Sequence, residues 1–326
     1  MILEKDKLID FLKALPYKVF VPQKSDDIVT FGELDGEIKM DKKPVVPPKK
    51  ILFPQTDPLF RYRTEDGIEI EPEIDTEEKV IFGVRPCDAR SFVILDSLFK
   101  KDYEDPYYIK RREKTILIGL TCTTPWVNCF CTSVGGSPSS KEGFDVLFTD
   151  LGDRYYVEAV TERGKKLLDS DLLKEAGKED ENEKEAIHRK AEELIRRKMD
   201  EEGIKRLETA FESKIWEEIA RKCIKCGICT YLCPTCHCFD IQDEARETSG
   251  RRVRIWDSCM FPEYSLEASG HNPRPTRAYR MRNRVFHKFK WYPENFGVVA
   301  CVGCGRCIDK CPVNIDIIDI MSRVSE

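Results

Sequence analysis

The sequence predicts an α/β amino-terminal domain with a mainly parallel sheet, followed by an all-α, helical ferredoxin-like domain that holds two 4Fe-4S clusters. Apolar strand patterns alternate with a helical pattern in the first half of the chain, and a charged helical stretch follows. Two copies of Cys-x2-Cys-x2-Cys-x3-Cys-Pro lie beyond it. A chain of 326 residues is long enough for more than one core. We expect domain boundaries at 1–160, 161–222 and 223–326.

The strands and helices of the first domain follow from apolar periodicity. Segments 79–84 and 115–120 are apolar and rich in β-branched residues, which is typical of strands buried on both faces of a parallel sheet. Segment 89–99 has apolar residues at helical spacing. Segments 145–151 and 154–160 predict a hairpin added to the sheet.

The connection at 161–222 is highly charged and predicts two helices, at 183–199 and 204–222. The second helix places its apolar residues on one stripe, with acidic and basic residues on the other face. We expect the stripe to pack against the protein and the charged face to be solvated. The stripe consists of Ile204, Leu207, Phe211, Ile215 and Ile219.

Composition limits the class of protein. Charged residues make up 35% of the chain but the net charge is only -5, so no overall field attracts nucleic acid or a membrane. The N-terminus is acidic from Glu4 and has no long apolar core, and no segment approaches a membrane span. We therefore expect a cytoplasmic protein, in which clustered cysteines bind metal rather than form disulfides.

The two cysteine motifs predict two 4Fe-4S clusters. In two-cluster ferredoxins the fourth cysteine of each motif ligates the other cluster. The first cluster then takes Cys223, Cys226, Cys229 and Cys311, and the second takes Cys301, Cys304, Cys307 and Cys233. A pair of zinc sites is the alternative, but it leaves the third cysteine and the Cys-Pro ending unexplained. The long separation of the motifs favours the helical type of two-cluster domain.

Four cysteines of the first domain predict a third 4Fe-4S cluster. Cys87 and Cys122 each follow the carboxyl end of a predicted strand, where ligand sites of α/β folds gather. Cys129 and Cys131 follow in the next loop, and Asp88 offers a substitute ligand. Free cysteines are also common as small buried apolar residues, so this alternative stays open.

Three further cysteines, Cys236, Cys238 and Cys259, extend the first motif and are candidates for another metal site, with His237 beside them. The alternatives are thiols that hydrogen-bond to cluster sulfur, or plain packing. Cys229, Cys233 and Cys236 also show the Cys-x3-Cys-x2-Cys spacing of radical enzymes that cleave S-adenosylmethionine. We interpret that spacing as a coincidence, because two of these cysteines complete the ferredoxin pattern.

A basic run at 274–290 is interleaved with aromatic residues. Such a pattern is typical of RNA-binding segments. It also suits positive charges that stabilise an anionic cluster or dock an acidic partner subunit, or a solvated face. The run contains Arg274, Arg277, Arg280, Arg282, Arg284, Lys288 and Lys290.

Several of these stretches together resemble the beta subunits of soluble NiFe sulfhydrogenases, and they are similar also to the iron-sulfur subunits of the anaerobic sulfite reductases. The resemblance is carried by 47–54, 82–96, 120–122, 128–131, 233–240, 256–261, 269–284 and 301–307.

The resemblance implies an electron relay in a multisubunit oxidoreductase. A partner subunit with FAD takes electrons from NAD(P)H, and another carries the terminal site, NiFe or sirohaem. The chain itself has no dinucleotide fingerprint, P-loop or HExxH motif, so we expect no substrate-converting site in it. An iron-sulfur RNA-binding protein is the alternative of another class.

Overall fold

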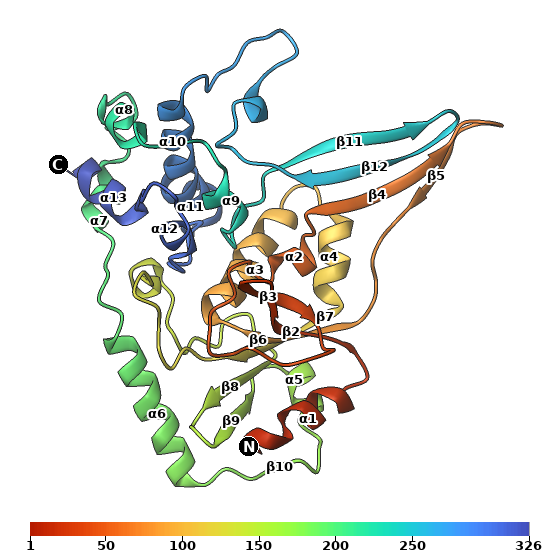
Figure 1. Ribbon diagram of the computed structural model, residues 1–326, viewed down its shortest axis with the longest axis vertical. Coiled ribbons are helices and arrows are strands. Elements are labelled where there is room, and N and C mark those ends of the chain that lie inside the picture. The colour runs from red at the N-terminus through yellow and green to blue at the C-terminus, as the bar shows by residue number, and fades with distance from the viewer. Residues whose placement is uncertain (326) are drawn as a thin grey trace.

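An eight-stranded sheet forms the centre of the α/β region in the computed structural model, which describes residues 1–325 (Figure 1). Its strand order is β10-β1-β9-β8-β7-β6-β2-β3. The strands are β1 (Ile2–Glu4), β2 (Lys18–Ser25), β3 (Ile28–Glu33), β6 (Lys79–Val84), β7 (Thr115–Leu120), β8 (Val146–Asp150), β9 (Arg154–Ala159) and β10 (Leu173–Lys174).

The sheet is parallel at its centre and antiparallel towards both edges. Strands β2, β6, β7 and β8 run parallel to their neighbours, and every residue of β6 and β7 is buried. The predicted strands and the β8–β9 hairpin are thus confirmed. The expectation of a mainly parallel sheet is corrected to a mixed sheet, because β1, β3, β9 and β10 pair antiparallel.

Helices cover both faces of this sheet and bury an apolar core on each side. Helices α1 (Leu8–Ala14) and α5 (Glu162–Leu167) pack on one face. The other face carries α2 (Lys49–Leu52), α3 (Pro86–Phe99) and α4 (Pro106–Glu113). Helix α3 contains the predicted segment 89–99 and begins earlier, at Pro86, because proline has the φ angle of a first helical turn. A short 3-10 turn, η1 (Lys5–Lys7), precedes α1.

The charged connection is less regular than its periodicity indicates. Helix α6 (Lys178–Glu193) begins and ends several residues before the predicted helix at 183–199. The predicted helix 204–222 is wrong as one element, because α7 (Glu201–Arg206) and α8 (Ile215–Ala220) are separated by turns. The apolar stripe nevertheless packs in the carboxyl-terminal core, so burial of these side chains decides the local path rather than helix propensity.

The carboxyl-terminal region consists mainly of short helices around the cysteine motifs. They are α9 (Ile228–Tyr231), α10 (Arg277–Phe286), a π-helical turn η4 (His287–Trp291), α11 (Tyr292–Phe296), α12 (Arg306–Asp309) and α13 (Ile317–Ser325), with 3-10 turns η2 (Cys131–Val134) and η3 (Glu263–Ser265) elsewhere. Within residues 1–325 we find no helix that combines the length and apolar character of a membrane span.

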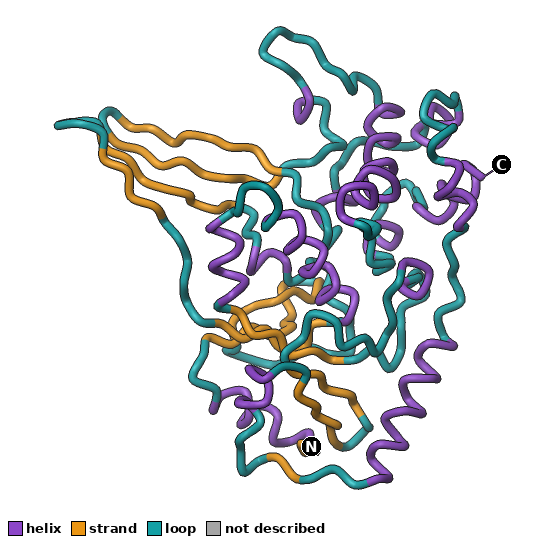
Figure 2. The backbone as a smooth tube through the Cα atoms, turned by 180° about the vertical axis from the view of Figure 1, so that it is seen from behind, coloured by secondary structure: helices purple, strands orange, loops and turns teal. Residues whose placement is uncertain are grey.

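A four-stranded antiparallel sheet corrects the expectation of an all-helical carboxyl-terminal domain. Its order is β11 (Phe239–Arg246), β12 (Ser249–Trp256), β4 (Thr56–Arg63) and β5 (Glu69–Pro72). It projects from the body as a blade in both orientations (Figures 1 and 2). Each half of the chain supplies two strands, so the division at residues 160 and 222 stays a proposal. Strand β11 is exposed throughout, which leaves it without an apolar alternation to read.

A buried ionic cluster fixes the base of this blade to the α/β region. Asp57 of β4, 1% exposed, accepts from Arg111 of α4 at 2.8 Å and from Arg254 of β12 at 2.7 Å. Arg254 also pairs with Asp105, which caps α4. Three elements distant in sequence thus meet at one carboxylate.

Candidate iron-sulfur centres

The first ferredoxin set surrounds one cavity. Cys223, Cys226, Cys229 and Cys311 all line it, and Arg284 of α10 lies at its wall. Gly227 precedes α9 with a positive φ of 73°, and a side chain there would meet the ring of Phe261. Glycine therefore permits the turn that brings the first three thiols of the motif around one point.

The second set surrounds a neighbouring cavity lined by Cys233, Cys301, Cys304 and Cys307. Gly305 precedes α12 with φ 75° and ψ -8°, and Gly227 precedes α9 with φ 73° and ψ -8°. The two motifs therefore fold the same way. In each cavity the fourth wall cysteine comes from the other motif, Cys311 in the first and Cys233 in the second. This grouping is the one predicted from spacing.

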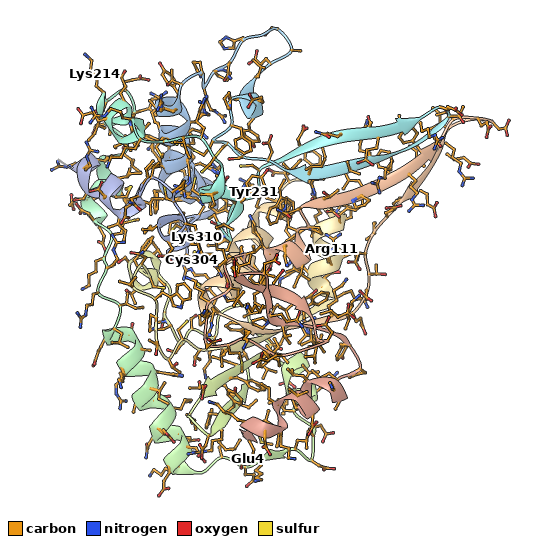
Figure 3. The ribbon with its side chains drawn as sticks, viewed as in Figure 1. Glu4, Arg111, Lys214, Tyr231, Cys304 and Lys310 are labelled. Atoms are coloured by element: carbon orange, nitrogen blue, oxygen red, sulfur yellow. The ribbon has the colours of Figure 1, made fainter. Side chains whose placement is uncertain are left out.

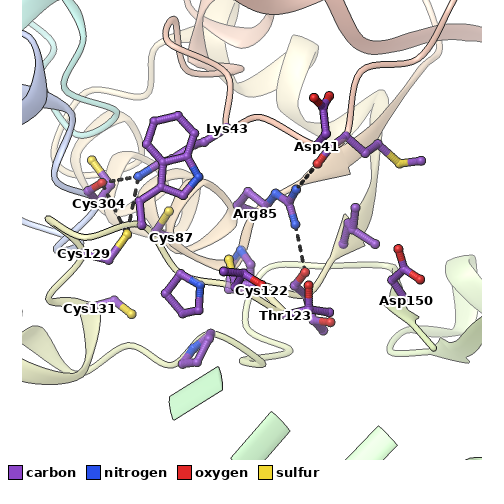
Figure 4. A pocket seen from close by; sticks show the side chains of 18 of the residues that line it. Asp41, Lys43, Arg85, Cys87, Cys122, Thr123, Cys129, Cys131, Asp150 and Cys304 are labelled. Carbon is purple, nitrogen blue, oxygen red and sulfur yellow. Dashed lines mark hydrogen bonds between the residues drawn. The ribbon is translucent and has the colours of Figure 1, made fainter. Parts of the chain in front are cut away.

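The four cysteines of the α/β region line a third cavity together with Cys304 (Figure 4). Cys122 follows β7, and Cys87 lies in the first turn of α3 directly after β6. Asp88 is not available as a ligand, because its fully buried carboxylate pairs with both Nη atoms of Arg306, at 2.6 and 2.8 Å. The substitute-ligand suggestion for Asp88 is therefore wrong.

The three cavities form a row. Cys304 lines both the third and the second cavity, and Cys307 and Arg284 line both the second and the first. Cys304 lies where the carboxyl-terminal helices meet the α/β region (Figure 3). Clusters in these places would be separated by little more than shared cysteines.

Two cysteine loops interlock at that junction. The amide of Phe130 donates to the carbonyl of Gly303 at 2.9 Å. A Cβ atom on Gly303 would lie 2.5 Å from the amide nitrogen of Cys131, so only glycine allows the approach. The buried pair of Arg306 and Asp88 lies beside this contact. The relative position of the second and third cavities is thus fixed by packing.

Buried cations lie among the thiols. Lys288 is 3% exposed and donates to Cys233 Sγ at 3.3 Å, and Lys43 is 6% exposed and reaches Cys129 Sγ at 3.8 Å. Burial lowers the pKa of Lys288, Lys43 and Arg284, but the surrounding cysteine sulfurs outweigh it and raise all three. The environment therefore favours anionic sulfur.

These features fit 4Fe-4S clusters. The Nε atom of Arg284 is buried without a hydrogen-bond partner, which suits a group that accepts from it. Within residues 1–325 no three Cys, His, Asp or Glu side chains converge on one point as a single ion requires. A cubane distributes its four thiolates over four irons, and the cysteines accordingly stand around cavities. When bound, such clusters accept and release one electron at a time.

The basic run at 274–290 is turned largely inward. Arg280 is 2% exposed and donates to the carbonyl of Arg274 at 2.7 Å, while Arg284 reaches the carbonyl of Cys229 at 3.4 Å. Arg277 donates to the carbonyl of Arg221 at 2.9 Å. These side chains hold the cysteine loops and the cluster environment, which disfavours an RNA-binding face.

The remaining cysteines lie at the base of the β11–β12 hairpin. Cys238 precedes β11 and Cys259 follows β12, so the hairpin brings them together. A hydrogen bond from Cys259 lowers the pKa of Cys238 to about 6. His237 is held by the carbonyl of Thr235 at 3.1 Å, and burial lowers its pKa to about 3. A metal site on Cys236, Cys238 and Cys259 stays a prediction.

Two cations of the site are absent from the sequence prediction. Lys43 contacts sulfur 86 positions away in the chain, and Arg306 pairs with a carboxylate 218 positions away. No local motif marks Lys43. Arg306 lies inside the second cysteine motif, and that position is the only signal that could have drawn attention to it.

Comparison with known proteins agrees with this geometry. Residues 222–315 match the 4Fe-4S dicluster domain. The chain is 32% identical over 316 residues to sulfhydrogenase 2 subunit beta of Pyrococcus furiosus, an alignment that covers 95% of this chain and 92% of that protein. The chain belongs to the sulfhydrogenase beta-subunit family. This confirms the resemblance carried by the cysteine motifs.

A second relative is the F420-dependent formate dehydrogenase subunit beta of Methanocaldococcus jannaschii, 25% identical over 173 residues, with 52% of this chain and 38% of that protein covered. No solved structure matches the chain significantly. Both relatives are subunits of oxidoreductases. The sulfhydrogenase beta-subunit homologue is thus an iron-sulfur, electron-transferring oxidoreductase subunit.

Proposed function

We propose that this chain relays electrons through three 4Fe-4S clusters in a cytoplasmic, NAD(P)H-linked complex of the hydrogenase type. The row of three cysteine-lined cavities carries the proposal, because neighbouring cavities share Cys304 and Cys307. An FAD-containing subunit delivers electrons from NAD(P)H at one end, and a NiFe subunit receives or supplies them at the other. The iron-sulfur subunit of an anaerobic sulfite reductase is the second candidate.

Purification of the native complex under anaerobic conditions tests this proposal. We expect the chain to co-purify with FAD and nickel, and its clusters to be reduced on addition of NADH or NADPH. Nickel without sirohaem absorbance supports the hydrogenase type, and sirohaem without nickel supports the sulfite reductase type. A complex that lacks both, or clusters that neither nucleotide reduces, would contradict the relay.

One end of the row reaches the surface at Cys226, the exposed member of the first set. Next to it Ile224 is 57% exposed. The surrounding basic residues are also exposed: Arg221, Lys222, Lys225 and Lys310. An apolar contact ringed by positive charge suits a partner subunit with an acidic face, and electrons would pass where Cys226 meets it.

Charge reversal at this face is expected to weaken assembly. Lys222→Glu should raise the Kd for the separated partner subunits by about tenfold at low salt, mainly through slower association, and the difference should shrink as salt is added. Binding of the recombined subunits measures this. Lys13→Glu, an exposed lysine on α1, is the matched control. Equal effects of both variants would place the partner elsewhere.

A further inference from the structure

The third cavity is much larger than its cysteines require. Its volume is about 630 Å³, whereas the two cavities lined by the ferredoxin cysteines measure about 30 and 20 Å³. All three are lined by a predicted set of four cluster ligands. The larger volume also lies within the range of small-molecule sites. The third cavity therefore has room for a second occupant beside a cluster.

The cavity has two chemically different ends. Figure 4 shows Cys87, Cys129, Cys131 and Cys304 gathered at one side, with Arg85 in the middle and Asp150 at the other side. The end away from the cysteines lies outside the carboxyl termini of β6, β7 and β8, which supply Arg85, Thr121 and Asp150. Ligands of open α/β sheets bind in this place.

An unpartnered hydroxyl lies in the wall of the cavity. Thr121 is 1% exposed, and its Oγ1 has no hydrogen-bond partner among the described residues. Its amide is already bonded to the carbonyl of Phe148, and its own carbonyl accepts from Arg85. A buried hydroxyl left unbonded destabilises the fold, so this position is better explained by a ligand that completes it.

The charges at this end leave one cation without neutralisation. Lys5 pairs with Asp150 at 2.8 Å, and Lys39 pairs with Glu37 at 2.7 Å. Asp41 is exposed, so water screens its charge. The guanidinium of Arg85 donates to two carbonyls, those of Thr121 and Met40, each at 2.9 Å, and neither carries a charge.

The other walls suit an organic molecule. Met40, Leu120 and Pro125 contribute apolar surface between the two ends. Tyr155, 2% exposed, also lines the cavity. Burial raises the pKa of its phenol to about 12, so it keeps its proton and can donate a hydrogen bond.

We infer that the cavity binds an anionic flavin mononucleotide-type carrier, with its phosphate held by Arg85 and Thr121 and its ring directed to the cysteine end. The ring assignment rests on the proposed relay, because a neighbour of a one-electron cluster must exchange single electrons. Nicotinamides transfer hydride, whereas flavins can do both. The anion site itself rests on the cavity alone.

Equilibrium binding of FMN to the full chain with its clusters, prepared anaerobically, tests this inference. We expect one FMN per chain, with quenched flavin fluorescence. Arg85→Ala should weaken binding at least about tenfold, because a charge-assisted hydrogen bond is lost. Arg63→Ala, an exposed arginine on β4, is the matched control and should bind as the wild type does.

Thr121→Val separates a binding role from a folding role. The free variant should have a thermal midpoint equal to or above that of the wild type, because an unbonded hydroxyl is removed, yet it should bind FMN several-fold more weakly. Absent FMN binding by protein with its full iron content overturns the inference and leaves the relay intact. Inorganic phosphate that competes as tightly as FMN overturns the ring assignment, and unchanged binding by Arg85→Ala overturns the anion site.

Discussion

Cys311→Ala is expected to remove one cluster and interrupt the relay. Wild-type protein prepared anaerobically should contain about twelve irons and an equal amount of acid-labile sulfide, as three four-iron clusters require. The variant should retain about eight irons, because Cys311 lies in the wall of the first cavity only. Electron transfer along a single row of clusters is serial, so transfer across the complex should fall to background.

Parallel variants assign the other two clusters. Cys233→Ala should lose about four irons from the second cavity, and Cys122→Ser about four from the third, whose thiols come from the α/β region. Pro312→Ala, next to Cys311 but not a ligand, is the matched control and should keep about twelve. Wild-type protein with about eight irons would reject the third cluster.

Electron paramagnetic resonance of the reduced variants distinguishes crosswise from local ligation. With crosswise ligation, Cys311→Ala alters the cluster of the first motif and leaves the signal of the second unchanged. With local ligation the same variant alters the cluster of Cys301, Cys304 and Cys307. The geometry predicts the first outcome, because Cys311 and Cys223 line the same cavity.

Asp57→Ala is expected to destabilise the protein by about 3–5 kcal/mol, because it leaves two buried guanidinium groups without their shared carboxylate. Arg111 and Arg254 are each 3% exposed, so water cannot replace Asp57. The total stability of a domain is typically about 5–15 kcal/mol, so this loss is large. The blade should detach from α4 first, since Asp57 joins β4 and β12 to that helix.

Thermal or urea unfolding of anaerobic protein measures this effect, with the iron content checked before each experiment. Asp243→Ala is the matched control, since Asp243 forms an exposed pair with Arg252 on the same blade at 2.7 Å. Screening by water leaves such pairs with little effect, so the midpoint should not move. An Asp57→Ala variant as stable as this control would show that the buried cluster does not hold the blade.

Local patterns predicted the parts of the site that depend on short spacing. Three thiols can converge from one loop only at fixed separations, so the ferredoxin sets could be grouped correctly from the spacing of the cysteines alone. The strands at 79–84 and 115–120 were equally predictable, because burial on both faces requires an uninterrupted apolar run. Cys87 and Cys122 follow these strands and therefore reach the same edge.

Other features depend on contacts between distant segments. Strand β11 is exposed along its whole length, so its pairing with β12 and β4 left no apolar signal. The predicted helix at 204–222 broke because its apolar side chains pack in different directions within one core. Periodicity describes one face of a straight helix and cannot record such a change of direction.

The sequence by itself determined the chemistry of this protein: its cysteine spacing specifies two clusters and nominates a third, because metal ligation from a loop is a local property. Tertiary structure alone decided how these centres stand to one another and what charge surrounds them. Lys43, Asp88 and Arg306 come from distant segments, and their roles arise from burial beside sulfur or beside each other. Such interactions leave no periodic trace, because nothing in the chain between the partners has to repeat.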